Sequence, residues 1–224
     1  DIDELMSRTK QRPVASDRIS PVKALAFGVL LNIFSFAILA AWVNLFAAVL
    51  TLAATLFYVF VYTNWLKRTT TQNIVIGGAA GSIPPVVGWV AVTGSLDLPA
   101  LYLFAVVFFW TPPHFWALAM LIQKDYEAAK IPMLPVVAGR EHTVQVIFMY
   151  SLVLVAISLV FATTSAVGLV YLGSAAVLGA IFVALAWNLK GDITTKRART
   201  LYLFSLLYLA LLFVAMIADS KLYY

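Results

Sequence analysis

The sequence predicts an all-α protein, a polytopic bundle of transmembrane helices. Of its 224 residues, 63% are hydrophobic and only 11% are charged. Soluble domains carry about 25% charged residues, so this chain lacks the charge that covers a water-facing surface. Its apolar runs are continuous, whereas the strands of a membrane β-barrel alternate between apolar and polar residues. The composition therefore excludes a cytosolic enzyme, a disordered chain, a nucleic-acid reader and a β-barrel.

Seven apolar runs have the length of about 20 residues that crosses a bilayer core of about 30 Å. The first follows a polar stretch and lacks the features of a signal peptide, so it is expected to be a mature span. The third opens with a glycine-rich stretch and Pro84-Pro85, which permit close helix approach and a kink. The predicted spans are residues 22–42, 44–62, 73–93, 99–122, 143–163, 166–188 and 200–219.

The charges lie mostly on one side of this predicted bundle. Fourteen of the 15 Lys and Arg residues fall in segments 1–23, 63–72, 123–142 and 189–199. By the positive-inside rule, this side and the N-terminus face the cytoplasm, and seven spans place the C-terminus outside. Eight of the 10 acids lie on the same side, so we expect any chemistry at the cytoplasmic mouth.

The cytoplasmic segment 1–21 combines acids with cations. Asp1 and Asp3 are two residues apart, and Arg8, Lys10 and Arg12 follow them. Carboxylate oxygens suit Mg²⁺, which prefers one or two carboxylates together with phosphate oxygens and water. Arginine and lysine suit the phosphate. The alternative interpretation is a solvated segment that binds anionic lipid headgroups.

The second polar segment, residues 62–73, is a predicted short loop that carries Lys67 and Arg68. Adjacent cations at a helix end are most often topology anchors, and this interpretation stays open. The glycines that follow are explained by helix packing, or by a kink that lines a cavity.

The third polar segment joins the fourth span to the cytoplasmic loop 123–142. His114 is the one His, Lys, Arg, Asp or Glu that lies away from the ends of the predicted spans, and it follows two prolines among aromatic residues. It is either a structural residue that ties two helices together or a ligand in a cavity. Asp125 lies two to three turns further on, so two acidic segments and one basic segment are expected to converge on a Mg²⁺-diphosphate.

These segments together resemble the protoheme IX farnesyltransferase family, a group of UbiA-type intramembrane prenyltransferases. The resemblance covers essentially the whole chain. It rests on strings that occur in the same order as in the family: Asp1-Ile2-Asp3, Arg8-Thr9, Arg12-Pro13, Tyr62-Thr63, Trp65-Leu66-Lys67-Arg68, Asn73-Ile74-Val75-Ile76-Gly77-Gly78, Pro84-Pro85, Gly88-Trp89, Trp110, Pro113-His114-Phe115, Asp125-Tyr126 and Pro132-Met133-Leu134-Pro135.

The resemblance implies a nine-helix fold with a cytoplasmic-side active site. The implied reaction transfers a farnesyl group from farnesyl diphosphate to a vinyl group of haem B, giving haem O and pyrophosphate. Haem A synthase is implied as a partner. The implied location is the inner (plasma) membrane, or the mitochondrial inner membrane in a eukaryote.

The resemblance also implies the site residues. Mg²⁺ is expected to bind Asp1, Asp3 and Asp125, and the implied catalytic residues are Asp3, Asp125, Lys67 and Arg68. Aromatic faces that stabilise the allylic cation are expected from Phe109, Trp110, Phe115 and Trp116. The implied substrate-binding residues are Arg8, Arg12, Tyr62, Asn73, Trp110, His114, Phe115 and Tyr126.

The chain departs from the family at two points. The family's first acidic motif reads Asn-x-x-x-Asp-x-x-x-Asp, and Asp3 matches its last Asp while Asp1 matches an extra Asp two residues earlier. The resemblance therefore implies a single prenyltransferase domain over residues 1–224 that lacks the first two helices and is inactive alone. At Lys130 the family commonly has Gly.

Two alternatives stay open at this stage. One is a prenyltransferase of the same superfamily that acts on a quinone precursor or a chlorin. The other is a small membrane transporter or lipid-binding module, which the lack of charge at the bilayer midplane disfavours.

Overall fold

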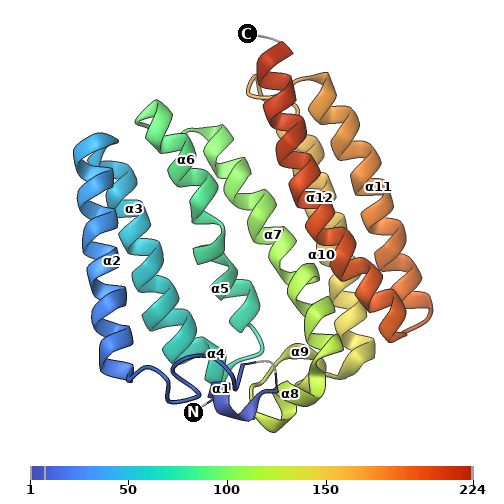
Figure 1. Ribbon diagram of the computed structural model, residues 1–224. Coiled ribbons are helices and arrows are strands. Elements are labelled where there is room, and N and C mark those ends of the chain that lie inside the picture. Colours follow the sequence, from blue (N-terminus) through green and yellow to red (C-terminus); the bar gives the residue numbers. More distant parts are fainter. Residues whose placement is uncertain (1, 8, 223–224) are drawn as a thin grey trace.

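The computed structural model describes residues 2–7 and 9–222, and every regular element in this part of the chain is a helix (Figure 1). The elements are α1 (Ile2–Leu5), α2 (Pro21–Trp42), α3 (Leu45–Leu56), η1 (Phe57–Leu66), α4 (Lys67–Thr69), α5 (Asn73–Gly81), α6 (Ile83–Thr93), α7 (Leu98–Leu121), α8 (Gln123–Ala128), α9 (Leu134–Val137), α10 (Gly139–Phe161), α11 (Leu169–Gly191) and α12 (Thr195–Leu222).

The predicted fold class is confirmed. Seven helical stretches are long and apolar enough to cross a membrane, and they coincide with the seven predicted spans within a few residues at most ends. In Figure 1 the N-terminus lies at the lower end of the bundle and the C-terminus at the upper end. The short helices α1, α4, α8 and α9 gather at the lower end.

The second span is longer than predicted. It was expected to end at residue 62, but it continues to Thr69 through the π-helix η1, so most of the predicted loop 63–72 is helical. The wide turn of η1 is visible in its hydrogen bonds, because Thr63 Oγ1 donates to Tyr58 O at 2.9 Å and the Lys67 amide donates to Tyr62 O. Wide π turns inside α-helices occur frequently at functional sites.

The third span is interrupted where the sequence predicted a kink. Helix α5 ends at Gly81 and α6 begins at Ile83, just before Pro84 and Pro85. These prolines cannot donate to the preceding turn, and the Ser82 hydroxyl donates to the carbonyl of Gly78 at 2.8 Å. By contrast, α7 continues as a helix through its own proline pair.

The bundle has two unequal halves around α7. Helices α10, α11 and α12 pack against one another, and α7 packs against α10 and α12. Their core contains fully buried side chains such as Ile147, Leu154, Phe182 and Tyr208. On the other side, α7 contacts α5 and α6, and these lead to α3. Helix α2 packs mainly against α3, and none of its residues is buried.

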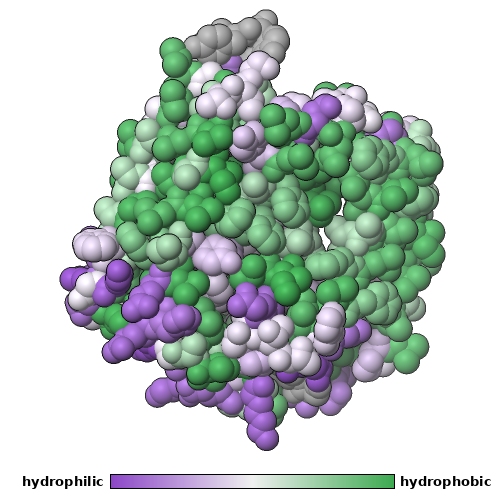
Figure 2. Space-filling view, turned by 180° about the vertical axis from the view of Figure 1, so that it is seen from behind, coloured by the Kyte–Doolittle hydropathy of each residue, from purple (hydrophilic) through white to green (hydrophobic). Residues whose placement is uncertain are grey.

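The surface matches this arrangement. Figure 2 shows an apolar belt over the spans, with hydrophilic residues gathered at the lower end, where the predicted cytoplasmic loops lie. At the opposite end, Asp219 is 2% exposed and accepts backbone hydrogen bonds from Gly168, Val170 and Tyr171 at 2.6, 3.2 and 2.8 Å. This acid, which lies outside the basic side, therefore caps the first turn of α11.

Candidate active site

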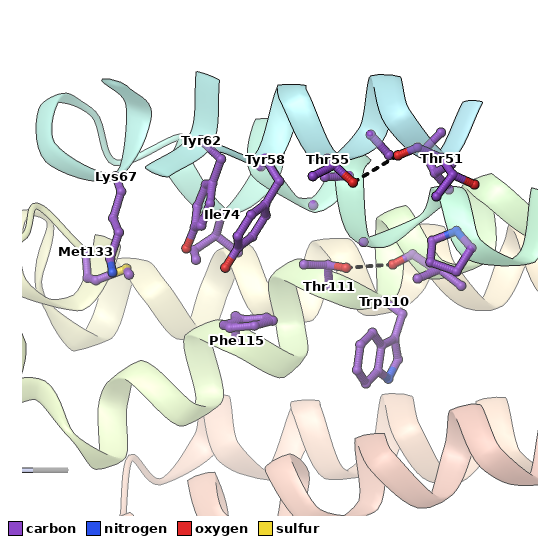
Figure 3. A pocket seen from close by; sticks show the side chains of 18 of the residues that line it. Thr51, Thr55, Tyr58, Tyr62, Lys67, Ile74, Trp110, Thr111, Phe115 and Met133 are labelled. Atoms are coloured by element: carbon purple, nitrogen blue, oxygen red, sulfur yellow. Dashed lines mark hydrogen bonds between the residues drawn. The ribbon is translucent and has the colours of Figure 1, made fainter. Parts of the chain in front are cut away.

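A cavity of about 810 Å³ lies between α7 and the half of the bundle that α2, α3, η1, α5 and α6 form, and Figure 3 shows part of its lining. Its charged lining residues lie at the lower end of the bundle, and we call this end of the cavity its mouth. Its charged lining residues come from the segment around α1 and from α4, and most of its apolar ones come from α2, α3, α5, α6 and α7. The predicted site residues that line it are Asp3, Arg12, Tyr62, Lys67, Trp110, Phe115 and Tyr126.

The first acidic segment folds back on itself at the mouth of this cavity. Arg12 Nη1 donates to Asp3 Oδ2 at 2.9 Å, and Thr9 Oγ1 donates to the Asp3 carbonyl at 2.9 Å. Both charged side chains remain partly exposed, 34% for Asp3 and 58% for Arg12. A carboxylate and a guanidinium thus share one wall of the mouth, while Asp1 and Arg8 lie outside the described residues.

The second acidic segment reaches the first through a serine. Ser7 Oγ lies 2.9 Å from Asp125 Oδ1 and 2.7 Å from Oδ2, and its hydroxyl donates to this carboxylate. Asp125 lies in α8 and does not line the cavity itself. The structure therefore brings together the two acidic segments, 118 residues apart in the chain, as the sequence predicted.

The π-helix directs its side chains into the cavity. Figure 3 shows Tyr58 and Tyr62 pointing from η1 toward Phe115 of α7, and Lys67 pointing toward Met133. The two tyrosine rings lie 5.2 Å apart. The Tyr62 ring rests directly on Gly77, where an added Cβ would lie 2.1 Å from ring atom Cδ2. Glycine at this position is thus required for the ring to sit where it does.

Sequence reasoning identified Tyr62 but missed the other hydroxyl groups that line the cavity, those of Thr51, Thr55, Tyr58 and Thr111. Thr51, Thr55, Tyr58 and Tyr62 all line it, and Thr111 of α7 lines it too. The first four are spaced four, three and four residues apart, which places them on one helix face. This spacing in an otherwise apolar span was the signal that could have identified them.

Of the four predicted aromatic residues, two line the cavity and two do not. Phe115 lines it, and so does Trp110, whose indole points toward α12 in Figure 3 and donates to the Ser205 carbonyl at 2.7 Å. Phe109 and Trp116 are absent from the lining, and both rings pack against Tyr150. The expectation that all four face the cavity is therefore wrong, because sequence spacing does not show which way each helix face turns.

His114 lies on the side of α7 that faces α12. It is 6% exposed, its Nδ1 lies 2.7 Å from Ser205 Oγ, and its ring stacks on Trp110 and Tyr202. Ser205 Oγ donates to the Tyr202 carbonyl, so the serine oxygen accepts a hydrogen bond from the Nδ1–H group of His114. This geometry ties two helices together, and substrate binding by His114 stays a prediction.

Two further predicted residues lie outside the cavity lining. Asn73 is completely buried at the start of α5, and both atoms of its amide lack a hydrogen-bond partner among the described residues. It adjoins Ile74, which does line the cavity. Arg68 is exposed in α4 and is also absent from the lining.

The residues at the mouth fit Mg²⁺ by their chemistry. Asp3 and Asp125 supply carboxylate oxygens, and Mg²⁺ needs only one or two of these when phosphate oxygens and water complete its shell. No cluster of three or more His, Cys, Asp or Glu occurs within residues 2–7 and 9–222. An all-protein metal cage is thus not present in this part of the chain, and a shared protein-phosphate site is the arrangement that the donors suit.

The chemistry of this cavity suits an amphiphilic anion, with charged groups at one end and apolar surface along the rest. Its mouth carries a carboxylate, a guanidinium and an ammonium group, and its interior is mostly apolar. The model of the UbiA prenyltransferase family matches residues 1–218, and the chain is a member of this family of membrane prenyltransferases.

Several curated relatives near 50% identity carry the same name. A protein of Gloeobacter violaceus named protoheme IX farnesyltransferase is 54% identical over 98% of this chain and 72% of its own length. One of Roseiflexus sp. strain RS-1 with the same name is 55% identical over 98% of this chain but only 41% of its own length. The family resemblance predicted from the motifs is confirmed.

A solved structure shows the same fold. A structure described as digeranylgeranylglyceryl phosphate synthase superposes with a TM-score of 0.78. The match covers 97% of this chain and 78% of the other at 17% identity. This likeness supports the architecture, and the names of the relatives bear on the substrates.

Proposed function

We propose that the protein transfers a farnesyl group from farnesyl diphosphate to a vinyl group of haem B and releases pyrophosphate. The observation that carries this proposal is the match, near 50% identity, to proteins named protoheme IX farnesyltransferase. The cavity supports it independently, because a charged mouth and an apolar interior suit a diphosphate with a long isoprenoid tail.

The mouth is the proposed diphosphate site. Lys67 and Arg12 would bind the diphosphate oxygens, and Asp3 and Asp125 would hold Mg²⁺. The metal supplies positive charge where negative charge develops on the leaving group. Arg12 now pairs with Asp3, and a diphosphate at the mouth competes for the same guanidinium.

The interior is the proposed place of bond formation. The C1–O bond of farnesyl diphosphate breaks and the electron pair leaves with pyrophosphate. The allylic cation at C1 is then attacked by the vinyl carbon, and water captures the resulting cation and loses a proton. Phe115 and Tyr62 present rings to this space, where cation–π attraction stabilises the positive charge.

The proposed orientation follows from the charges. The end of the bundle with α1, α8 and α9 carries fourteen of the 15 basic residues in its connecting segments, so it is placed in the cytoplasm. Haem B and farnesyl diphosphate then enter from the cytoplasmic side of a plasma or mitochondrial inner membrane. Haem A synthase, which would consume the product, remains a proposed partner.

The test is pyrophosphate release by the full-length protein with and without haem B. Asp3→Asn and Asp125→Asn keep the side-chain shape but remove the charge that binds the metal, so each should lower turnover at least 100-fold while leaving folding intact. Glu141→Gln is the matched control, because Glu141 is an exposed acid of the same end. Normal rates in either aspartate variant would reject the assigned metal site.

A second measurement separates the substrates. Lys67→Ala should weaken farnesyl diphosphate binding more than haem binding, and equal losses would indicate a structural role for Lys67. Replacing haem B by a quinone precursor or a chlorin tests the alternative acceptors. Faster release with either acceptor than with haem B would contradict the proposed reaction.

A further inference from the structure

A second concave site lies on the lipid-facing surface, between α10 and α11 and away from the active-site cavity. It is an open groove of about 570 Å³. Its α11 wall consists mainly of small residues between Ala176 and Trp187, and its α10 wall includes Phe148, Val155 and Leu159. Gly179 lets the two helices approach closely, because an added Cβ would lie 2.7 Å from Val155 Cγ1.

The groove has the length of one membrane leaflet. Its α11 residues run from Ala176 to Trp187, and eleven steps of 1.5 Å give about 16 Å. Half of a bilayer core is about 15 Å thick. The groove therefore has room for one acyl chain along its length, and its Trp187 end is the one nearer the basic end of the bundle.

A cation stands at the end of the groove where a lipid phosphate would lie. Lys190 Nζ lies 5.2 Å from the ring centre of Trp187 and 5.3 Å from that of Phe148, and both rings also line the groove. The ammonium thus turns back over the groove rather than away from it. Tryptophan at this level is typical of the membrane interface.

The neighbouring charges leave this ammonium available. Asp192 is the acid closest to Lys190 in the chain, and it pairs instead with Arg197 at 3.3 Å. Among residues 2–7 and 9–222, Lys190 has cation–π contacts but no carboxylate partner. A strongly hydrated ammonium beside an apolar groove suits an anionic headgroup better than the apolar surface of another protein.

We propose that this groove binds one anionic phospholipid of the cytoplasmic-side leaflet, such as phosphatidylglycerol. One acyl chain lies along the small residues of α11, and the phosphate pairs with Lys190 above Trp187 and Phe148. The site is separate from the prenyl-transfer cavity, and none of its lining residues is shared with it.

The experiment uses fluorescence quenching in nanodiscs by lipids with brominated acyl chains. The signal of Trp187 is the difference between the chain and its Trp187→Phe variant, which removes one of six tryptophans. Brominated phosphatidylglycerol should associate with this site about fivefold more strongly than brominated phosphatidylcholine. That ratio corresponds to ~1 kcal/mol for one lysine at a membrane surface.

Two variants test the two parts of the site. Lys190→Gln should bring the preference for the anionic lipid close to one, whereas Lys196→Gln, the same charge change at the same end, should preserve it. Ala180→Leu fills the groove from an exposed position and should reduce quenching of Trp187 by both lipids.

Several results would overturn the proposal. Equal association of the two lipids with the unsubstituted chain, or a preference that survives Lys190→Gln, would remove the headgroup site. Unchanged quenching in Ala180→Leu would remove the acyl-chain site. Absence of quenching by either lipid, together with a dimer that Ala180→Leu dissociates, would assign the groove to a second copy of the chain.

Discussion

The contact between Gly77 and Tyr62 gives the sharpest prediction about the shape of the active-site cavity. Gly77→Ala adds one methyl group whose carbon would lie 2.1, 2.7 and 2.9 Å from three atoms of the Tyr62 ring. Ordinary carbon–carbon contacts lie at about 3.5–4.0 Å, so the ring must move by about 1.4 Å or more. Since Tyr62 lines the cavity, the movement changes the space available to substrate.

The expected cost combines two opposing effects. Overpacking a closely packed site costs ~1–3 kcal/mol, whereas replacing glycine by alanine inside a helix stabilises it by ~1 kcal/mol. The overlap is with the ring itself and involves three atoms, so the upper part of the range applies. We expect a net loss of about 1–2 kcal/mol in the free energy of unfolding, with farnesyl diphosphate affinity lowered about tenfold.

The assay is unfolding in detergent micelles combined with farnesyl diphosphate binding. Gly88→Ala is the matched control, because Gly88 lies in α6 with no atom within 4 Å of an added Cβ and should be neutral or slightly stabilising. In a Tyr62→Ala background the overlap is absent, so Gly77→Ala should no longer destabilise the protein. The reasoning is refuted if Gly77→Ala retains stability and affinity, or if its cost persists without the tyrosine ring.

Three further predictions concern single residues with defined surroundings. Lys130 has a left-handed backbone with φ 52° after α8, so Lys130→Gly should raise the free energy of unfolding by ~1 kcal/mol. An unchanged melting temperature would show that the backbone at Lys130 is not strained. Asp219→Asn keeps the side-chain shape but weakens the cap of α11, so it should lower the free energy of unfolding by ~1–2 kcal/mol. Hydrogen exchange at the Gly168 amide should become faster, and an unchanged exchange rate would contradict the cap. His114→Ala removes the contact with Ser205 and should lower stability by ~2 kcal/mol without moving the Soret band of bound haem. A shifted band in the folded variant would instead make His114 an iron ligand.

The sequence predicted the large-scale arrangement because long apolar runs and loop charges have few structural interpretations. The seven spans, the break before Pro84 and the convergence of the acidic segments all belong to this group. The family resemblance also indicated that glycine is common at the position of Lys130. The left-handed backbone of Lys130 explains this preference.

The finer features depend on rotation about helix axes, which neither composition nor motif order determines. A π turn shifts every later side chain around the axis, so the directions of Tyr62 and Lys67 were not derivable from an ideal helix. His114 and Trp116 turn away from the cavity for the same kind of reason. The partner of Asp125 is Ser7, a residue with no motif signal of its own.

The weak packing of α2 against the other described residues makes one wall of the cavity depend on its surroundings. Leu39 of this helix lines the cavity, yet no residue of α2 is buried and its main protein contact is α3. Packing among the described residues therefore holds little of this wall, and its position depends on what covers α2. Substrate affinity measured on this chain should accordingly change with the detergent, lipid or protein segment that contacts α2.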